Sequence, residues 1–467
     1  MPPLPKLNFA SNPAAPASVP ARPAASRLAL MPLVCVMYLV VSGGAYGLED
    51  AVRMAGPRLT LLLCAAVPLT LSIPTALMAA ELTALMPVEG GFYFWVKEAL
   101  GPFAGFAEAY LTILYTAVDM AIYPVLFSAY LSFLFPIGQM AQIAAGAALV
   151  WLSGLLNFLG IRPTGRASIV LFIAVIAPFA ALTIAGLPRL IHFQMPTPPL
   201  WGADPAGALA AGLTVIIWNY CGWENLSVVA GEIEDPRRNY LRAILITVPL
   251  VAMGYLLPLG VSVSGASGSA AWTTGWFSHV GRDLGGPLLG VALALGGATM
   301  AFAVFEAGML WVSRMPFVLA RERYLPPPLA QVWAATAVPG KSIILCCVIF
   351  TLLAPLGFTE LVVLDVFFYM AALGLELAAL IRLRQLMPDR AGKFTIGGGR
   401  IGLFLTAALP MLTWAATFGF AISANGIKTE FYLAIALAAC AWPAYAICRR
   451  RYGGPPKIDP APLTIGA

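Results

Sequence analysis

Long uncharged stretches recur along almost the whole chain, and they limit its possible folds more than any other feature. Hydrophobic residues make up 60% of the 467 residues and charged residues only 10%, whereas an ordinary soluble domain carries about 25% charged residues. One globular core cannot bury so many apolar side chains, but a helix of ~20 of them can cross a bilayer. The sequence therefore predicts an all-α integral membrane protein in contact with lipid.

About twelve stretches are long enough to span a membrane. They fall near residues 28–54, 58–86, 101–135, 137–159, 166–188, 207–231, 240–263, 285–313, 341–357, 359–385, 401–424 and 429–448. The first 27 residues are rich in Pro and Ala, so we expect a disordered cytoplasmic tail there. We expect a second cytoplasmic tail at residues 449–467.

Basic residues are distributed unevenly between the two sides of this layout. If the N-terminus lies in the cytoplasm, the outward side holds Arg53, Arg58, Arg189, Arg282 and Lys428, and the other 22 of the 27 basic residues lie inside. Lys and Arg favour the cytoplasmic side, so we expect both termini there, in a plasma membrane such as the bacterial inner membrane. The net charge of +6 follows this topology and does not indicate a nucleic-acid partner.

Two connections have distinctive compositions. Residues 92–98 are aromatic and mildly amphipathic, which favours a segment lying along the cytoplasmic interface. Residues 264–283, rich in Ser and Gly, form the longest polar connection on the outer side.

Two spans carry a glycine-rich, polar interruption in the middle, at residues 42–47 and 218–225. Glycine weakens a helix, and unwound backbone is tolerated at membrane depth only where it lines a cavity or is covered by protein. Glycine patches also allow helices to pack closely, which is the alternative for each patch alone. Because the interruptions lie in the first and sixth spans, they predict inverted repeats at 28–188 and 207–385 with a binding site between them. Residues 401–448 would add two C-terminal spans.

Several motifs resemble those of the amino acid–polyamine–organocation permeases. The matching segments are residues 229–240 (VAGEIEDPRRNY), 87–93 (PVEGGFY), 101–106 (GPFAGF) and 320–326 (ARERYLP). Residues 42–50 and 119–127 look most like the polyamine-uptake branch, a neighbour of the L-type amino acid transporters. The resemblance implies a LeuT-type fold with five-plus-five inverted repeats, broken helices 1 and 6, and two further helices. It also implies a secondary transporter for a small organic solute.

Acidic residues lie within the spans, but basic residues do not lie near any span's centre. The acids are Asp119, Glu224, Glu306, Asp365 and Glu376. Because a charge at mid-bilayer costs ~2.5–3.5 kcal/mol on insertion scales, such residues are usually functional. Without basic partners, they must be protonated, hydrated or satisfied by a transient cation.

A cationic substrate explains this pattern, with Asp119, Glu224 and Glu306 offering carboxylates to the ammonium groups of a polyamine. Nearby aromatic rings would add cation–π contacts of ~0.5–2 kcal/mol each; the candidates are Tyr46, Tyr115, Tyr123, Tyr220, Trp223 and Trp311. The predicted substrate-binding set is Gly43, Gly44, Ala45, Tyr46, Asp119, Tyr123, Tyr220, Trp223, Glu224 and Glu306. The same three carboxylates are the candidates for proton coupling, and H⁺ is the expected coupling ion.

Other acids have simpler interpretations. Glu81 and Glu108 lie toward span ends, where water is expected to reach them, and we expect them to be structural. Glu49 and Asp50 follow the first interruption and either line an outer vestibule or pair with Arg53.

An amino acid permease or exchanger is the alternative function. In related permeases, backbone N–H groups at the first interruption hold the substrate carboxylate, and the matching residues are 43–46. This chain departs from the family's usual Gly-Ser-Gly there and lacks a hydroxyl at that position. Some proton-coupled relatives carry a Lys in mid span five, where this chain has only Arg166 at the end. For sodium, span eight offers only Thr299 and Ser313.

The sequence lacks the residue patterns that other classes of function require. A membrane enzyme needs a nucleophile, base or metal cluster, but the two histidines, His192 and His279, fall in connections and the seven cysteines have no metal-ligand spacing. No charged ring or repeated pore loop indicates a channel. We therefore expect a small-molecule substrate and the lipid bilayer as partners, with no cofactor, metal, nucleic acid or obligate protein partner.

Overall fold

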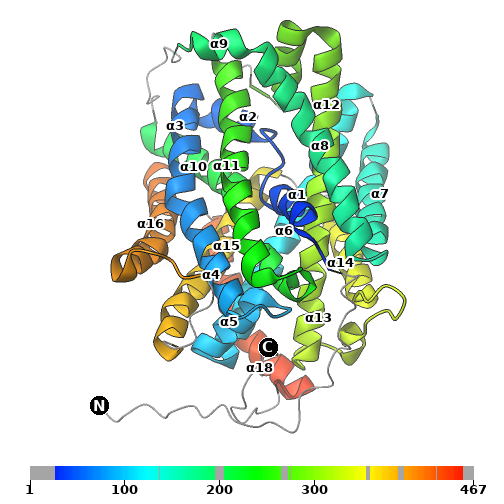
Figure 1. Ribbon diagram of the computed structural model, residues 1–467, viewed down its shortest axis with the longest axis vertical. Helices are drawn as coiled ribbons and strands as arrows, with labels where there is room; N and C mark the ends of the chain where they lie inside the picture. The colour runs from blue at the N-terminus through cyan, green and yellow to red at the C-terminus, as the bar shows by residue number, and fades with distance from the viewer. Residues whose placement is uncertain are drawn as a thin grey trace.

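The computed structural model describes residues 27–135, 137–194, 204–264, 272–273, 275–353, 358–387, 394–427 and 429–455. Within these ranges the chain is helical (Figure 1), apart from loops and two isolated bridges, Leu28 to Ile233 and Trp333 to Val338. Ten of the described helical stretches are long and apolar enough to cross a membrane. The two shorter apolar helices, α1 (Leu30–Val41) and α14 (Gly340–Leu353), fall on the first and ninth predicted spans. The prediction of an all-α, multi-pass membrane protein is confirmed.

The first half of the chain builds five spans. They are α1 with α2 (Leu48–Ala55); α3 (Pro57–Val67) with the π-helical η2 (Pro68–Ser72) and α4 (Ile73–Leu85); α6 (Pro102–Leu134); α7 (Gln139–Phe158); and α8 (Ile161–Ala185). Two short helices, α5 (Gly91–Leu100) and α9 (Leu187–Ile191), lie outside the spans. The first span is broken where predicted, because α1 ends at Val41 and α2 begins at Leu48.

The second half begins with another broken span, α10 (Pro205–Tyr220) followed by the 3-10 helix η3 (Asn225–Glu232). The remaining elements are α11 (Pro236–Val263), α12 (Trp276–Val312), α13 (Arg314–Arg321), η4 (Pro327–Ala330), α14, α15 (Phe358–Leu386), α16 (Gly399–Asn425), α17 (Thr429–Ala439) and α18 (Ala441–Tyr452).

Several boundaries differ from the sequence predictions. Helix α12 begins at Trp276, inside the predicted polar loop, and has a kink at Gly286, where φ is 74°. Helix α18 continues to Tyr452, beyond the predicted start of the C-terminal tail at residue 449. The predicted N-terminal tail lies outside the described residues, except for Arg27.

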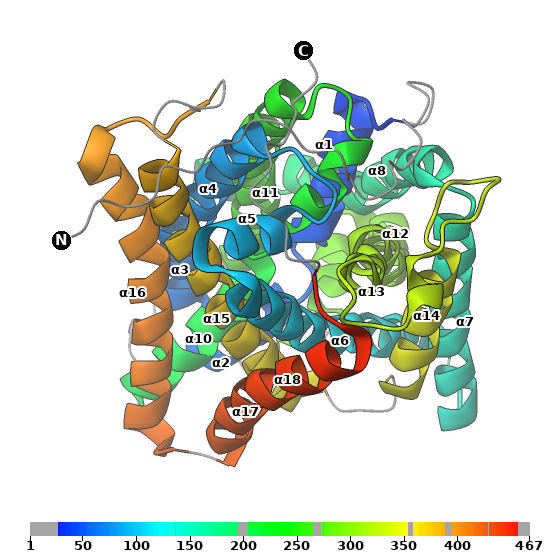
Figure 2. The ribbon, with the colours of Figure 1, turned by 90° about the horizontal axis from the view of Figure 1, so that it is seen from below.

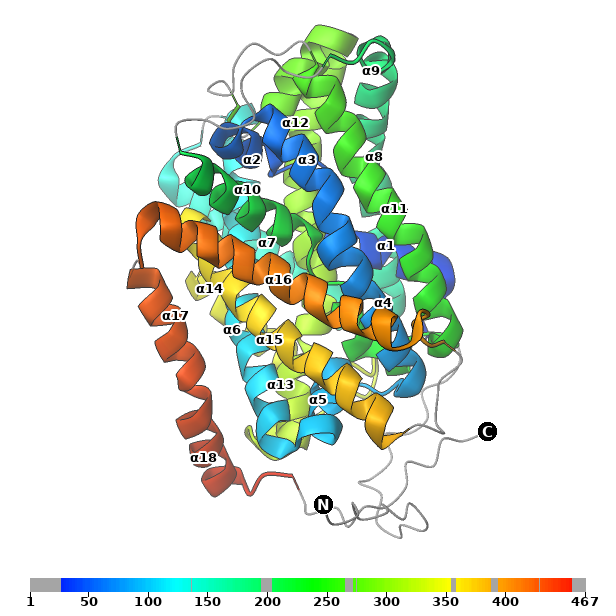
Figure 3. The ribbon, with the colours of Figure 1, turned by 90° about the vertical axis from the view of Figure 1, so that its left-hand side faces the viewer.

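The helices form one bundle in which α6, α12 and α15 pack together near the centre. Helix α15 lies along α6, and α12 packs against both α6 and α8. Seen from below, α7 and α14 lie at one edge and α16 at the opposite edge (Figure 2). Helix α16 crosses over α10 and α4, while α17 and α18 run down beside α15 and α6 (Figure 3).

The short helix α5 is more enclosed than its aromatic sequence suggested. We expected residues 92–98 to lie along the membrane interface, but Phe92, Tyr93 and Trp95 are buried against protein. Trp95 Nε1 donates to the Met86 carbonyl at 3.3 Å, and the Lys97 ammonium pairs with Glu322. These aromatic rings therefore pack α5 against the bundle.

Basic residues are concentrated at one end of the bundle. Helix α9, which carries Arg189, lies at the upper end in Figure 1. Helices α13 and α18 lie at the lower end and carry Arg321 and residues 449–451. The predicted outward residue Lys428 is outside the described residues.

Candidate functional site

The break in the first span begins where Ser42 leaves helical geometry, with φ −143° and ψ 131°. Gly44 then takes a positive φ of 76°, which costs little without a Cβ. The Gly44 N–H donates to Ser42 Oγ at 3.1 Å, so this side chain satisfies one of the freed backbone groups. A Cβ on Gly44 would lie 2.9 Å from the Phe179 ring, so a larger residue would also be crowded.

The break in the sixth span is stabilised by hydrogen bonds between its backbone and two tyrosine hydroxyls. Helix α10 ends at Tyr220, and Gly222 takes a φ of 92° before η3 resumes at Asn225. The Gly222 N–H donates to Tyr369 Oη at 3.1 Å, and Tyr255 Oη donates to the Asn219 carbonyl at 2.7 Å. Because buried backbone groups need partners, these two hydroxyls stabilise an unwound segment inside the bundle.

A cavity lies between the two breaks. Its wall comes from the end of α1, the first break, α6, the end of α10, the second break, α12 and α15. The volume that the centre of a water molecule can occupy in this cavity is ≈ 40 Å³. This is room for a few waters. An elongated solute would therefore need the surrounding helices to move apart.

Two aspartates from different helices share this cavity. Asp119 of α6 is half-buried, and its Oδ1 accepts hydrogen bonds from Tyr123 Oη at 3.0 Å and Trp218 Nε1 at 2.9 Å. Asp365 of α15 is buried, lines the same cavity as Asp119, and has an Oδ1 without a hydrogen-bond partner among the described residues. None of the described residues on the cavity wall is Lys or Arg. The cavity is thus acidic and open to a cation.

Aromatic rings form much of the remaining wall. The Tyr123 and Trp218 rings are stacked with centroids 6.3 Å apart, and the Tyr115 and Tyr369 rings meet edge to face at 5.5 Å. Tyr46 also lines the cavity, and its hydroxyl donates to the Leu293 carbonyl at 2.6 Å. Aromatic faces next to carboxylates can hold an ammonium group through both charge and cation–π attraction.

The structure places four of the predicted substrate-binding residues on the cavity wall: Gly43, Tyr46, Asp119 and Tyr123. Gly44 and Ala45 are buried in the break but do not face the cavity. Tyr220 and Trp223 are packing residues, since Tyr220 Oη donates to the Cys64 carbonyl at 3.0 Å and Trp223 Nε1 donates to the Tyr220 carbonyl at 2.9 Å.

The two predicted glutamates lie behind the wall. Glu224 is separated from the cavity by Tyr369, whose hydroxyl donates to Glu224 Oε2 at 3.2 Å. Glu306 lies on α12, where its Oε2 accepts a hydrogen bond from Ser168 Oγ of α8 at 3.3 Å. Glu306 is fully buried, and its Oε1 has no hydrogen-bond partner among the described residues.

Sequence reasoning left several wall residues out of the predicted set. The structure adds Asp365, Trp218, Asn219, Cys221, Asn225 and Tyr369. Asp365 had already been recognised as a buried acid, but nothing in the sequence indicated that it faces Asp119. The spacing of Asp365 and Tyr369, one helical turn apart, places both on one face of α15 and was the available signal.

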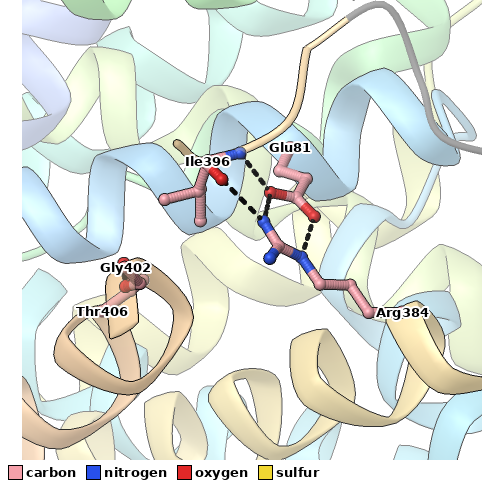
Figure 4. Close-up of polar contacts among 5 residues, drawn as sticks. All are labelled: Glu81, Arg384, Ile396, Gly402 and Thr406. Carbon is pink, nitrogen blue, oxygen red and sulfur yellow. Dashed lines mark hydrogen bonds and ion pairs between the residues drawn. The ribbon is translucent and has the colours of Figure 1, made fainter. Parts of the chain in front are cut away.

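Two acids at the lower end of the bundle, Glu81 and Glu232, are paired with arginines, unlike those at the cavity. Glu81 accepts hydrogen bonds from the Arg384 guanidinium and, at 2.7 Å, from the Ile396 N–H (Figure 4). A second pair is buried, with Arg314 Nε 3.3 Å from Glu232 Oε1. The structural role expected for Glu81 agrees with this contact. The contact with water expected for both Glu81 and Glu108 is wrong, because Glu81 is only 6% exposed and Glu108 is 0% exposed.

At the upper end, Asp50 pairs with Arg53 at 2.7 Å, which agrees with the simpler of the two expectations for this segment. Glu49 instead accepts hydrogen bonds from the Gly47 N–H at 2.8 Å and the Gly275 N–H at 3.3 Å. It joins the start of α2 to the start of α12. Among the described residues, no group of three or more His, Cys, Asp or Glu is placed to hold a metal ion.

Comparison with known proteins identifies the family of this fold and cavity. The family model described as amino acid permease matches residues 33–440. The chain is 31% identical over 402 residues to a probable polyamine transporter of Arabidopsis thaliana, covering 83% of this chain and 78% of that protein. It is 31% identical over 392 residues to polyamine transporter PUT1 of Oryza sativa subsp. japonica, covering 81% and 71%.

A more distant relative is the large neutral amino acids transporter small subunit 2 of Homo sapiens, which is 24% identical over 400 residues, covering 79% of this chain and 70% of that protein. The fold and central cavity define a multi-pass membrane transporter. The chain belongs to the amino acid permease family.

Proposed function

We propose that this protein is a secondary transporter that moves polyamines or related cationic amines by alternating access. The observation that carries the proposal is the pair Asp119 and Asp365 on a cavity wall that includes no basic residue among those described. Two carboxylates in a partly desolvated, aromatic cavity favour a ligand with more than one positive charge. The plant relatives named as polyamine transporters support the same substrate class.

Each substrate ammonium has candidate partners. Asp119 offers its carboxylate already oriented by Tyr123 and Trp218, and Asp365 offers an oxygen without a competing donor among the described residues. Gly43 and Tyr46 complete the wall beside the first break. A charge-assisted hydrogen bond of this kind contributes about 1.5–3 kcal/mol, which is enough to distinguish an amine from a neutral solute.

Uptake is coupled to protons in this proposal, through a buried carboxylate that is protonated on one side and deprotonated on the other. Of the three candidates, Asp119 lines the cavity directly, whereas Tyr369 separates Glu224 from it. Glu306 lies away from the cavity wall, between α12 and α8. Its position allows it to carry a proton without competing for the substrate, so we assign proton coupling to Glu306 first.

The protein lies in a plasma membrane with both termini in the cytoplasm in this proposal. Support comes from the basic residues of α13 and α18 at the lower end of the bundle, because Lys and Arg favour the cytoplasmic side. Substrate would then enter from the end that carries α9.

An amino acid permease or exchanger is the second candidate, favoured by Gly43 on the cavity wall and by the human relative. Against it, the Gly44 N–H already donates to Ser42 Oγ, which reduces the donors left for a substrate carboxylate. Thermal unfolding of the purified protein with putrescine, spermidine, lysine or leucine separates the candidates, since a ligand of the folded state raises the midpoint. We expect the polyamines to raise it and leucine to have no effect; the reverse result would overturn the proposal.

A further inference from the structure

A second group of carboxylates lies below the cavity, toward the lower end of the bundle. Tyr115, Asn225 and Tyr369 form the cavity floor, and Tyr115 Oη donates to Asn225 Oδ1 at 2.9 Å. Beneath this floor, Glu376 lies about two helical turns beyond Tyr369 on α15, and Glu108 lies about two turns before Tyr115 on α6. Glu224 accepts a hydrogen bond from Tyr369 Oη at 3.2 Å. We call Glu108, Glu224 and Glu376 the lower acidic layer, and Asp119 with Asp365 the upper acidic layer.

The two layers repeat the same arrangement on the same pair of helices. Asp119 follows Glu108 by eleven residues on α6, and Glu376 follows Asp365 by eleven residues on α15. Eleven residues are about three helical turns, so each pair shares a face and is separated by about 16 Å along the axis. Helices α6 and α15 pack along each other in opposite directions (Figure 3). The acids therefore follow one another in reverse order on the two helices, so that Asp119 corresponds to Asp365 and Glu108 to Glu376.

The local hydrogen bonding also repeats. In the upper layer, Asp119 accepts a hydrogen bond from the hydroxyl of Tyr123, four residues later. In the lower layer, Glu108 accepts one from the hydroxyl of Thr112, again four residues later, at 2.7 Å. Each layer thus presents one carboxylate oriented by its own helix and one from α15.

The lower acidic layer holds oxygens that no described residue satisfies. Glu108 is 0% exposed and Glu376 is 3% exposed, yet Glu108 Oε2 and Glu376 Oε2 have no hydrogen-bond partner among the described residues. Buried polar atoms are normally paired, and several buried carboxylates without a base repel one another when ionised. A cation that enters between them relieves both costs.

We propose that the lower acidic layer is a second ammonium site, which binds the distal charge of a long polyamine whose first ammonium occupies the upper acidic layer. This inference rests on the proposed function. The Tyr369 hydroxyl, which faces the cavity and donates to Glu224, is the gate between the layers. A polyamine with three or more nitrogens reaches both layers once this hydrogen bond opens, whereas a diamine engages the upper layer alone.

The test compares ligands that differ in one charge. Equilibrium binding of spermine, N-acetylspermine and putrescine is measured on the purified full chain, wild type and Glu376→Gln. We expect the substitution to weaken spermine binding about tenfold, the size of one lost charge-assisted hydrogen bond. Putrescine binding should stay unchanged, and N-acetylspermine, which lacks one terminal charge, should lose much less than spermine.

Asp365→Asn, on the same helix, is the matched control and should weaken all three amines. Glu108→Gln repeats the test from α6, so the result does not depend on how well one variant folds. Equal losses for spermine and putrescine in the glutamate variants, or no loss for either, would overturn the second site.

Two further outcomes are distinguishable. If wild type binds none of the three amines, the proposed function itself fails. If the amine affinities of Glu376→Gln match wild type and only the pH dependence of uptake changes, the lower acidic layer is a proton site and the second ammonium site is excluded.

Discussion

Carboxylates are buried in two regions of this bundle, and the regions differ in what surrounds them. At the lower end, Glu81 and Glu232 are each paired with an arginine from another part of the chain. At the centre, Asp365 and Glu376 have no basic partner among the described residues. The arginine-paired acids hold helices together permanently. The acids without a basic partner can be neutralised only by a proton or a cationic ligand that binds transiently. Burial of an acid alone therefore does not identify a substrate site in this fold.

The largest expected effect comes from breaking a pair at the lower end. Arg314→Met removes the guanidinium that lies 3.3 Å from the buried Glu232 carboxylate, and breaking a buried pair costs roughly 3–5 kcal/mol. The Arg314 side chain is fully buried, so water cannot compensate. Thermal unfolding in detergent should show a clearly lower midpoint than wild type.

The double variant Arg314→Met with Glu232→Leu is the control for this prediction. Replacing both partners by apolar residues of similar size is often neutral, so we expect most of the stability to return. A double variant as unstable as the single one would show that the contribution of Arg314 is not its pairing.

The next effect concerns the unpaired region. Asp119→Asn keeps the shape of the side chain but removes the charge, which should cost about 1.5–3 kcal/mol of amine binding, or roughly 10- to 150-fold in Kd. Isothermal titration with putrescine measures it. The melting temperature without ligand should change little, in contrast to Arg314→Met; a large loss of stability with normal affinity would remove Asp119 from the site.

A third prediction separates substrate binding from coupling. Glu306→Gln should abolish the stimulation of uptake by an inward proton gradient in proteoliposomes, because the proton carrier is lost. Putrescine affinity should change by less than about tenfold, since Glu306 does not line the cavity. Retained stimulation in this variant would return the coupling role to Asp119 or Glu224.

The smallest effect is expected at the outer pair of Asp50 and Arg53. The Arg53 side chain is 45% exposed, and exposed pairs contribute only about 0.2–1 kcal/mol. Asp50→Asn should leave both the melting temperature and amine affinity close to wild type. A loss as large as that of Arg314→Met would contradict the distinction between exposed and buried pairs.

The sequence predicted the breaks well because their signal is local. Glycines at Gly44 and Gly222 adopt positive φ, and composition alone locates such positions within a span. The placement of acids was harder, because it depends on which helices meet. Glu224 was expected at the substrate, but Tyr369, well over a hundred residues later, lies between it and the cavity. Asp365 lines the same cavity as Asp119 only because α15 packs along α6, which no single stretch of sequence encodes.

The burial of Glu108 also could not be predicted from its own span, because Glu108 is more buried than its position suggested. Its position near a span end predicted contact with water, yet Glu108 is 0% exposed. Helices α5 and α15 both pack against α6. Short helices such as α5 change the depth at which a residue is buried without altering the hydropathy of the span. Burial at span ends therefore requires the tertiary structure.

The central claim is that the upper acidic layer recognises an amine. The most direct measurement is uptake of radiolabelled putrescine by proteoliposomes containing wild type or Asp119→Asn, under an inward proton gradient, with leucine as the competing solute. We predict accumulation by wild type that unlabelled spermidine inhibits and leucine does not. At putrescine concentrations below the wild-type Kd, the variant should accumulate roughly tenfold less or lower still. No putrescine accumulation under any ion gradient, together with uptake of leucine, would contradict the account.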